Sequence, residues 1–294
     1  MEHLTCTPIT RDVVIARGSD AVSYIESQVT QDVGSLGDGE SAWSFLLTPK
    51  SVVIALLRVT RADATTVLLD MEPGIGEVVR GRIDGFLFRT DVAFDQETWT
   101  GYALRGPGSE EISSSAPIVM RDPWPGEDGL DVVGPGAELP PDAEEISADE
   151  LDALRIRLGW PSMVDFDEAT TPAMTGIVGH TVSFTKGCYT GQEFVARVHY
   201  REAAPPRRLV QIGFHPCSQP AVGDEIETGG ESVGSLTSVS RYQPLALGYL
   251  KRSIPSPSEA HVSGAPVCIG DTPASTTSRA EAKAPNTVSP LTLG

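Results

Sequence analysis

A change of pattern after Pro205-Pro206 divides the sequence into a long mixed region and a shorter region of closely spaced strands. Runs rich in aliphatic and β-branched residues alternate there with turn residues, which is typical of a small β-barrel or sandwich. The predicted strands are Leu209–Phe214, Asp224–Glu227, Ser232–Val239, Ala246–Leu250 and a segment within Ala260–Ile269. We therefore predict a C-terminal β-barrel over residues 207–275. Residues 276–294 are rich in Ser, Thr, Pro and Ala and are predicted to be a disordered tail.

The first 206 residues mix strand and helix patterns. A strand-like run at Val13–Ala16 precedes a helical pattern in which Val22, Ile25 and Val29 share one face. Further strands are predicted at Trp43–Leu47, Val52–Val59 and Thr65–Leu69, and a helix within Ile75–Leu87. This alternation predicts an α+β region rather than a helical bundle.

A weak internal repeat suggests that this region is duplicated. The run Val14–Gly18 and the run Tyr102–Gly106 carry similar strand-to-helix signals. We therefore predict two related subdomains, of about residues 1–98 and 99–206. Residues 126–150 are acidic and rich in Pro and Gly, and are predicted to be mostly loop. Ser147 with Glu150 forms a capping-box pattern that predicts a helix as far as Leu158.

Charge and hydropathy exclude several classes of protein. The formal net charge of -18 argues against general binding to nucleic-acid phosphates. No apolar run has the length of a membrane-spanning helix, and the N-terminus lacks the pattern of a signal peptide. A cytoplasmic protein without a direct nucleic-acid or membrane partner is therefore predicted. The four cysteines are far apart and show no metal-ligand spacing, so neither a disulfide framework nor a metal site is predicted.

The most informative segment for chemistry runs from Ser183 to Arg197. Thr190 and Glu193 are spaced as a capping box, which predicts a short helix with Cys188 just ahead of its positive end. A helix N-terminus and the nearby Lys186 ammonium would both favour the thiolate, so Cys188 is the best candidate for a reactive or ligating sulfur. The residues alone leave open the alternative that the segment is only a capped turn with an inert cysteine.

An arginine cluster follows this segment. Four arginines face a single acid, Glu202, between Phe194 and Gly223; they are Arg197, Arg201, Arg207 and Arg208. Guanidinium groups suit carboxylates, so the cluster could attract an anionic ligand. The alternative, that these arginines are solvated or paired within the protein, is equally open.

The segment Lys186-Gly187-Cys188-Tyr189-Thr190-Gly191-Gln192-Glu193 closely resembles the signature of the YgfZ/GcvT-like folate-binding family. Other blocks resemble the same family: Thr30–Val33, Leu47–Lys50, Leu154–Ile156 with Gly159 and Pro161, Val233–Ser238, and Ala246–Leu250. The resemblance runs from about Arg11 to Arg252.

The resemblance implies a GcvT-like three-part α+β fold, with two related α/β subdomains around a central cavity and a small C-terminal β-barrel. It implies that tetrahydrofolate binds in this cavity and that the segment around Cys188 lines it, with Cys188 as the catalytic residue. The folate contacts it implies are Gln31, Asp32, Arg155, Lys186, Gly187, Tyr189, Gly191, Gln192, Glu193 and Arg197. It also implies iron–sulfur client or assembly proteins as partners, including those that modify tRNA.

Departures from the family pattern rank the possible functions. The aminomethyltransferases carry carboxylates in the block that corresponds to Ser51–Leu57, and this chain has none there. A folate-binding accessory factor for iron–sulfur cluster assembly or repair is therefore the first hypothesis. A folate-dependent aminomethyl or one-carbon transferase, or demethylase, is the second, and a non-catalytic binding scaffold is the third. Transfer would need an acid in the pocket, for which the candidates are Asp32, Asp165 and Glu193. Arg157 and Met174 stand where many relatives have Glu, so the recognition of the pterin is expected to differ.

Overall fold

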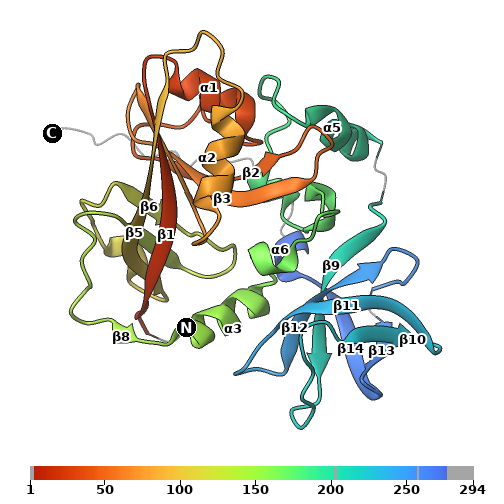
Figure 1. Cartoon of the computed structure of the whole chain (residues 1–294). Coiled ribbons are helices and arrows are strands. Elements are labelled where there is room, and N and C mark those ends of the chain that lie inside the picture. Colours follow the sequence, from red (N-terminus) through yellow and green to blue (C-terminus); the bar gives the residue numbers. More distant parts are fainter. Residues whose placement is uncertain (1–2, 202–203, 257, 277–294) are drawn as a thin grey trace, which may run out of the picture.

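The computed structural model describes residues 3–201, 204–256 and 258–276 of the 294-residue chain. The described residues form one large sheet and one closed barrel, with a mostly helical segment between them (Figure 1). No helix in these ranges is long and apolar enough to cross a membrane.

The large sheet is built around its longest central strand, β1 (Thr5–Arg17). β1 pairs antiparallel with β4 on one side and along its whole length with β5 on the other, and its first residues pair in parallel with β8. Apart from β8, the strands of the sheet lie in the order β2-β3-β4-β1-β5-β7-β6. Their bounds are β2 Ser41–Leu47, β3 Val53–Arg61, β4 Thr66–Met71, β5 Ala93–Arg105, β6 Ile118–Arg121, β7 Gly129–Val133 and β8 Glu144–Glu145.

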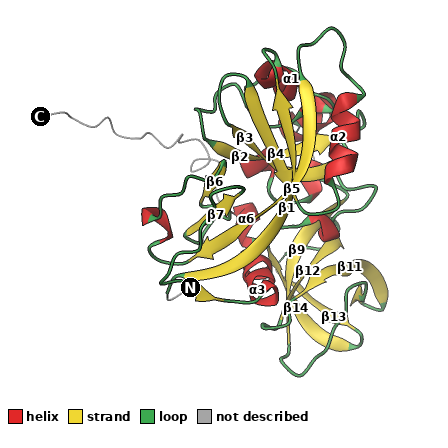
Figure 2. Ribbon diagram, turned by 60° about the vertical axis from the view of Figure 1, so that its left-hand side comes forward, coloured by secondary structure: helices red, strands yellow, loops and turns green. Residues whose placement is uncertain are grey.

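Helices α1 (Ala21–Gln28) and α2 (Gly76–Asp84) cover one face of this sheet (Figure 2). Val79 of α2 shares a buried hydrophobic cluster with Leu57 of β3 and with alternate residues of the neighbouring strands. Successive side chains of a strand point to opposite faces, so Arg58 points away from these helices. The face opposite α1 and α2 therefore carries charged as well as apolar side chains.

The structure changes the predicted division of the N-terminal region. The boundary expected at residues 98–99 falls inside β5, which pairs residue by residue with β1, so the two predicted subdomains share one continuous sheet. β1 is also much longer than the predicted Val13–Ala16, because Thr5–Asp12 pairs with β5 as well. This part of the strand contains Pro8 and shows little alternation of apolar and polar residues, so the sequence did not indicate it. β7 lies within the predicted loop 126–150, which is therefore only partly loop.

The predicted C-terminal barrel is confirmed. Its strands close in the order β10-β11-β12-β9-β14-β13 around a buried core that includes Val210, Ile212 and Leu236. The bounds are β9 Arg207–Phe214, β10 Glu225–Thr228, β11 Glu231–Val239, β12 Leu245–Lys251, β13 Ser258–Val262 and β14 Ala265–Asp271. The predicted run Ala260–Ile269 is two strands. The predicted tail lies almost entirely outside the described residues, which end in α6 (Pro273–Thr276).

The segment between sheet and barrel begins with α3 (Ala148–Leu158), which contacts both β1 and β12. The predicted capping box is confirmed: the Ser147 hydroxyl accepts the Glu150 N–H, and the Glu150 carboxylate accepts the Ser147 N–H. α3 ends at Gly159, whose φ of 69° is left-handed. The remaining short helices are η1 Ser109–Glu111, η2 Met163–Asp165, η3 Pro172–Met174, α4 Val178–Thr181 and α5 Gln192–Tyr200.

Candidate functional site

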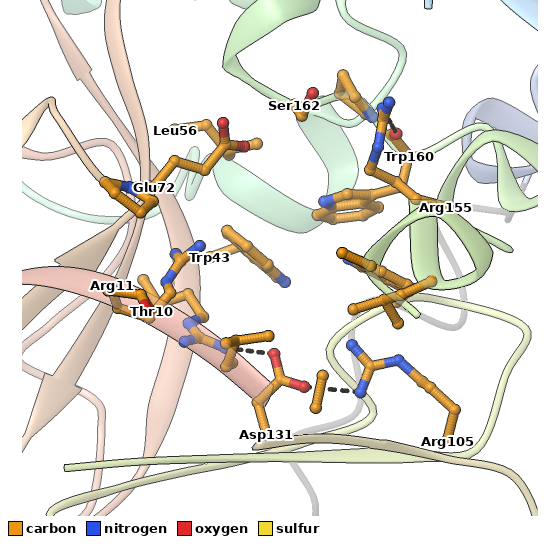
Figure 3. A pocket seen from close by; sticks show the side chains of 18 of the residues that line it. Thr10, Arg11, Trp43, Leu56, Glu72, Arg105, Asp131, Arg155, Trp160 and Ser162 are labelled. Carbon is orange, nitrogen blue, oxygen red and sulfur yellow. Dashed lines mark hydrogen bonds and ion pairs between the residues drawn. The ribbon is translucent and has the colours of Figure 1, made fainter. Parts of the chain in front are cut away.

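The candidate site is a cavity of about 310 Å³ between the large sheet and the start of the connecting segment. Strands β1, β2, β3, β5 and β7 supply one wall, and α3 with the following residues Trp160–Ser162 supplies the other. Trp124, from the loop between β6 and β7, completes the lining. Figure 3 shows Trp43 and Arg11 on the sheet side, facing Trp160 and Arg155.

Three of the four tryptophans of the chain line this cavity. Trp43 and Trp160 are in ring contact, with centroids 5.3 Å apart, and the Trp43 Nε1–H donates to the Pro123 carbonyl at 2.6 Å. The Arg105 guanidinium lies over Trp124, with its Cζ 4.3 Å from the ring centroid. Flat aromatic faces of this kind favour a planar ring as ligand.

A buried network of ion pairs forms the base of the cavity. Asp131 bridges two guanidinium groups, at 2.6 Å from Arg58 Nη1 and 2.6 Å from Arg105 Nη1 (Figure 3). Asp70 in turn accepts hydrogen bonds from Arg58 and from Arg11 Nε, the latter at 2.9 Å. Three guanidinium groups thus share two carboxylates, and the network is cationic by one charge. Burial lowers the pKa of Arg58, but Asp70 and Asp131 outweigh burial and raise this pKa above its ordinary value.

Two hydrogen-bond donors of the lining are left without a partner. The side chains of Arg105 and Trp160 are each 1% exposed, and Arg105 Nε and Trp160 Nε1 have no hydrogen-bond partner within the described ranges. Buried donors are normally paired, because an unpaired one loses the energy of its hydration. Both residues line the cavity, so an acceptor atom of a bound ligand could pair with these donors after a small adjustment of the side chains.

Arg155 is the predicted folate contact that does line the cavity, and the protein holds its guanidinium firmly. Its nitrogens donate to Asp165 Oδ2 at 2.9 Å, to Asp152 Oδ1 at 2.7 Å and to Ser238 Oγ at 3.0 Å. Asp165 is fully buried at its carboxylate and also accepts from the Ser238 hydroxyl. Asp165, proposed from the sequence as an acid for transfer chemistry, is instead used to tie the connecting segment to the barrel.

Lys186 lies in a different place from the one its sequence position suggests. Its ammonium is fully buried at the C-terminal end of α1, where it donates to the backbone carbonyls of Glu26, Val29 and Gln31 and pairs with the Glu26 carboxylate at 3.2 Å. Burial lowers the pKa of Lys186, although Glu26 opposes this effect. An ammonium has three N–H donors, and the three carbonyls use them all, so none remains for Cys188.

The predicted capping box at Thr190 is wrong. α5 begins one residue later, at Gln192, and its N-cap is Gly191 with a φ of 84° and no side-chain cap. A Cβ at Gly191 would lie 2.7 Å from the Thr48 carbonyl oxygen, so the close approach to β2 requires glycine. Glu193 reaches forward instead, to Arg197 at 2.6 Å, and its side chain is exposed.

The remaining residues of the signature segment lie behind the cavity or outside it. Tyr189 shares a buried cluster with Trp160, and burial raises the pKa of its hydroxyl to about 12. Gln31 donates to the Trp43 carbonyl at 3.3 Å, so it supports the tryptophan from outside the cavity. The other members do not line the cavity: Asp32, Gly187, Cys188 and Gln192. Cys188 is a free, exposed cysteine.

Three of the four arginines of the cluster are paired within the protein, and Arg201 is exposed. Arg207 contacts Asp167 at 2.5 Å, and Arg208 donates to the Ile254 carbonyl at 2.9 Å. Arg197 pairs with Glu193, as described above. These contacts favour the alternative of internal pairing over an anion site.

The two positions that differ from many relatives also lie outside the cavity. Arg157 pairs with Glu127, and Met174 is buried against the barrel.

The charged residues of the cavity carried a signal in the sequence that was missed. Arg58 is the lone charge in the apolar run Val52–Val59, and Asp131 is the lone charge in Gly129–Val133. A charged residue inside a buried strand must be paired, and such pairs gather at functional sites. No such isolated charge in an apolar run marked the other charged residues discussed for the cavity, which are Arg11, Glu72 and Arg105.

No protein-family model matches the chain. In sequence it is similar to a probable aminomethyltransferase of Natronomonas pharaonis, with 27% identity over 79% of this chain and 75% of that protein. It is also similar to the tRNA-modifying protein YgfZ of Yersinia enterocolitica, with 42% identity over 26% of this chain and 23% of that protein. The crystal structure of glycine cleavage system aminomethyltransferase T from Bartonella henselae matches 93% of this chain, with a TM-score of 0.72 and 17% identity. The predicted GcvT-like fold is thereby confirmed.

Proposed function

Because sequence relatives and fold together support a YgfZ/GcvT-like family for this chain, we propose that it binds a reduced folate in the cavity lined by Trp43, Trp124 and Trp160. The observation that carries this proposal is the pair of buried donors, Arg105 Nε and Trp160 Nε1, which lack partners in the part of the chain that the structure describes. A pterin offers ring nitrogens and a carbonyl oxygen as acceptors for them.

The size and shape of the site support a ligand with a flat head and a longer tail. The cavity falls at the lower end of the range for small-molecule sites. A wider groove of about 620 Å³ adjoins it and shares Glu72, Trp124 and Arg155 with it. The groove continues along β11 of the barrel and gives room for the benzoyl-glutamate part of a folate.

We propose further that the chain acts in the cytoplasm as an accessory factor for iron–sulfur cluster assembly or repair. The residues of the cavity would bind and orient the pterin and exclude water from it, while Cys188 lies on the surface, where a partner protein could reach its sulfur. The relative named tRNA-modifying protein YgfZ, which matches 26% of this chain, supports a role other than aminomethyl transfer.

Titration with folinic acid tests the binding proposal. We expect saturable quenching of tryptophan fluorescence, and about tenfold weaker binding by Trp160→Phe, which loses one hydrogen-bond donor. Trp99→Phe is the matched control, because Trp99 does not line the cavity, and it should bind like the wild type. A flat titration of the wild type would leave only a binding scaffold for some other partner.

The role of the exposed sulfur is tested separately. We expect Cys188→Ser to lose the ability to rescue a strain that lacks its own family member, while folinic acid binding is retained. Cys217→Ser and Cys268→Ser are matched controls, since both cysteines are also free and exposed. Full rescue by Cys188→Ser would remove the sulfur from the mechanism.

Aminomethyl transfer is the second candidate. The relative named probable aminomethyltransferase covers most of this chain, and the cavity contains the carboxylate of Glu72, although the block Ser51–Leu57 has none. Turnover of a methylated amine with tetrahydrofolate, lost in a Glu72 variant, would favour this candidate over the accessory role.

A further inference from the structure

Glu72 places a carboxylate at the edge of the cavity with most of its acceptor capacity unused. It follows the last residue of β4 and lines both the cavity and the adjoining groove. Its two oxygens share a single donor, the Met163 backbone N–H, at 3.2 and 3.3 Å. An ionised carboxylate has about four lone-pair sites, so several remain for a ligand.

Two other polar atoms of the lining have the opposite character. Arg105 Nε and Trp160 Nε1 are buried donors that lack a partner among the described residues. Figure 3 shows Glu72 on one side of the cavity and Trp160 and Arg105 on the opposite side. The cavity therefore has an acceptor edge and a donor edge, with tryptophan rings between them.

We propose that Glu72 is the residue that recognises the amino-pyrimidinone edge of the pterin, an inference that rests on the proposed binding of folate. That edge presents two adjacent donors, the 2-amino group and the N3–H, which match the two oxygens of a carboxylate. The ring carbonyl and ring nitrogens then face Arg105 and Trp160. This assignment sets the orientation of the ring in the cavity.

The assignment also accounts for the arginine at position 157. Many relatives have Glu at this position of α3, and the sequence therefore predicted a different recognition of the pterin here; Arg157 pairs with Glu127 away from the cavity. The sheet, through Glu72, supplies the carboxylate in place of α3. Glu72 is thus a specificity-determining residue that the motif of the family does not point to.

Two ligands and two variants test the inference by fluorescence titration. We expect Glu72→Gln to bind folinic acid about 10- to 100-fold more weakly than the wild type, since a hydrogen-bonded charge is lost. The wild type should bind the 2-desamino-2-methyl analogue more weakly than folinic acid by a similar factor. Glu72→Gln should bind the two ligands with nearly the same affinity. Asp95→Asn is the control, because Asp95 lines neither the cavity nor the groove and pairs with Arg17 on the surface, so the affinity of this variant should not change.

The outcomes separate this inference from the proposed function. Tight binding of folinic acid by the wild type, with equal affinity for the analogue, would overturn the role of Glu72 and leave folate binding intact. The wild-type comparison does not depend on the stability of any variant. No binding of folinic acid by the wild type would overturn both.

Discussion

Replacing Asp131 with alanine is expected to lower the free energy of unfolding by about 3–5 kcal/mol, because it leaves two buried guanidinium groups without their shared counter-ion. Arg58 and Arg105 are each 1% exposed at the side chain, and both contact Asp131 at 2.6 Å. Urea unfolding of the variant and the wild type measures this difference. The matched control is Asp95→Ala, which breaks the exposed pair with Arg17 at the same distance and should cost at most about 1 kcal/mol.

The pH dependence identifies the cause of this loss. Burial alone would raise the pKa of Asp131, but Arg105 and Arg58 outweigh burial and hold this pKa below its ordinary value. Such a carboxyl group stabilises the fold above its unfolded pKa of about 4, and the contribution is lost as the pH falls through the lower folded pKa. The difference in stability between wild type and Asp131→Ala should be constant above about pH 5 and shrink below about pH 4. A difference that keeps its size down to the acid transition would contradict the ion-pair account.

Lys186→Met is expected to cost about 3 kcal/mol of unfolding free energy, because the backbone carbonyls at the end of α1 lose their buried donor. Methionine keeps the length of the side chain, so packing against the Tyr189 ring is largely preserved. Denaturant unfolding measures the loss. This result would assign the lysine of the signature segment to holding that segment on α1 rather than to activating Cys188.

Lys251→Met is the matched control for this prediction. Lys251 is exposed and donates to one carbonyl, that of Ser232, at 2.8 Å. Its replacement should change the stability by less than about 0.5 kcal/mol. Equal stability of Lys186→Met and the wild type would show that water replaces the ammonium at the end of α1.

Local patterns predicted much of the fold. The strands of the barrel, the helices on the sheet and the capping box at Ser147 each depend on residues close together in the chain, and the structure confirms them. The boundary placed inside β5 shows where such patterns fail. The pairing of β5 with β1 joins residues far apart in sequence, and a short repeat does not reveal it.

The candidate site was predicted less completely than the fold. The segment from Lys186 to Glu193 was recognised, but the partners of Lys186 are more than 150 residues away, so its role as an anchor could not be inferred from its neighbours. The same holds for Trp43, Trp124 and Trp160, which come from three different elements and meet only in the folded chain. Arg58 and Asp131 could have been noticed as lone charges in apolar runs.

The location of the ligand is the central claim, and a structure of the protein with folinic acid bound tests it most directly. The account predicts the pterin between Trp43, Trp124 and Trp160, with acceptor atoms within hydrogen-bond distance of Arg105 Nε and Trp160 Nε1. A pterin bound instead beside Cys188 on the surface, with the cavity filled only by water, would contradict it.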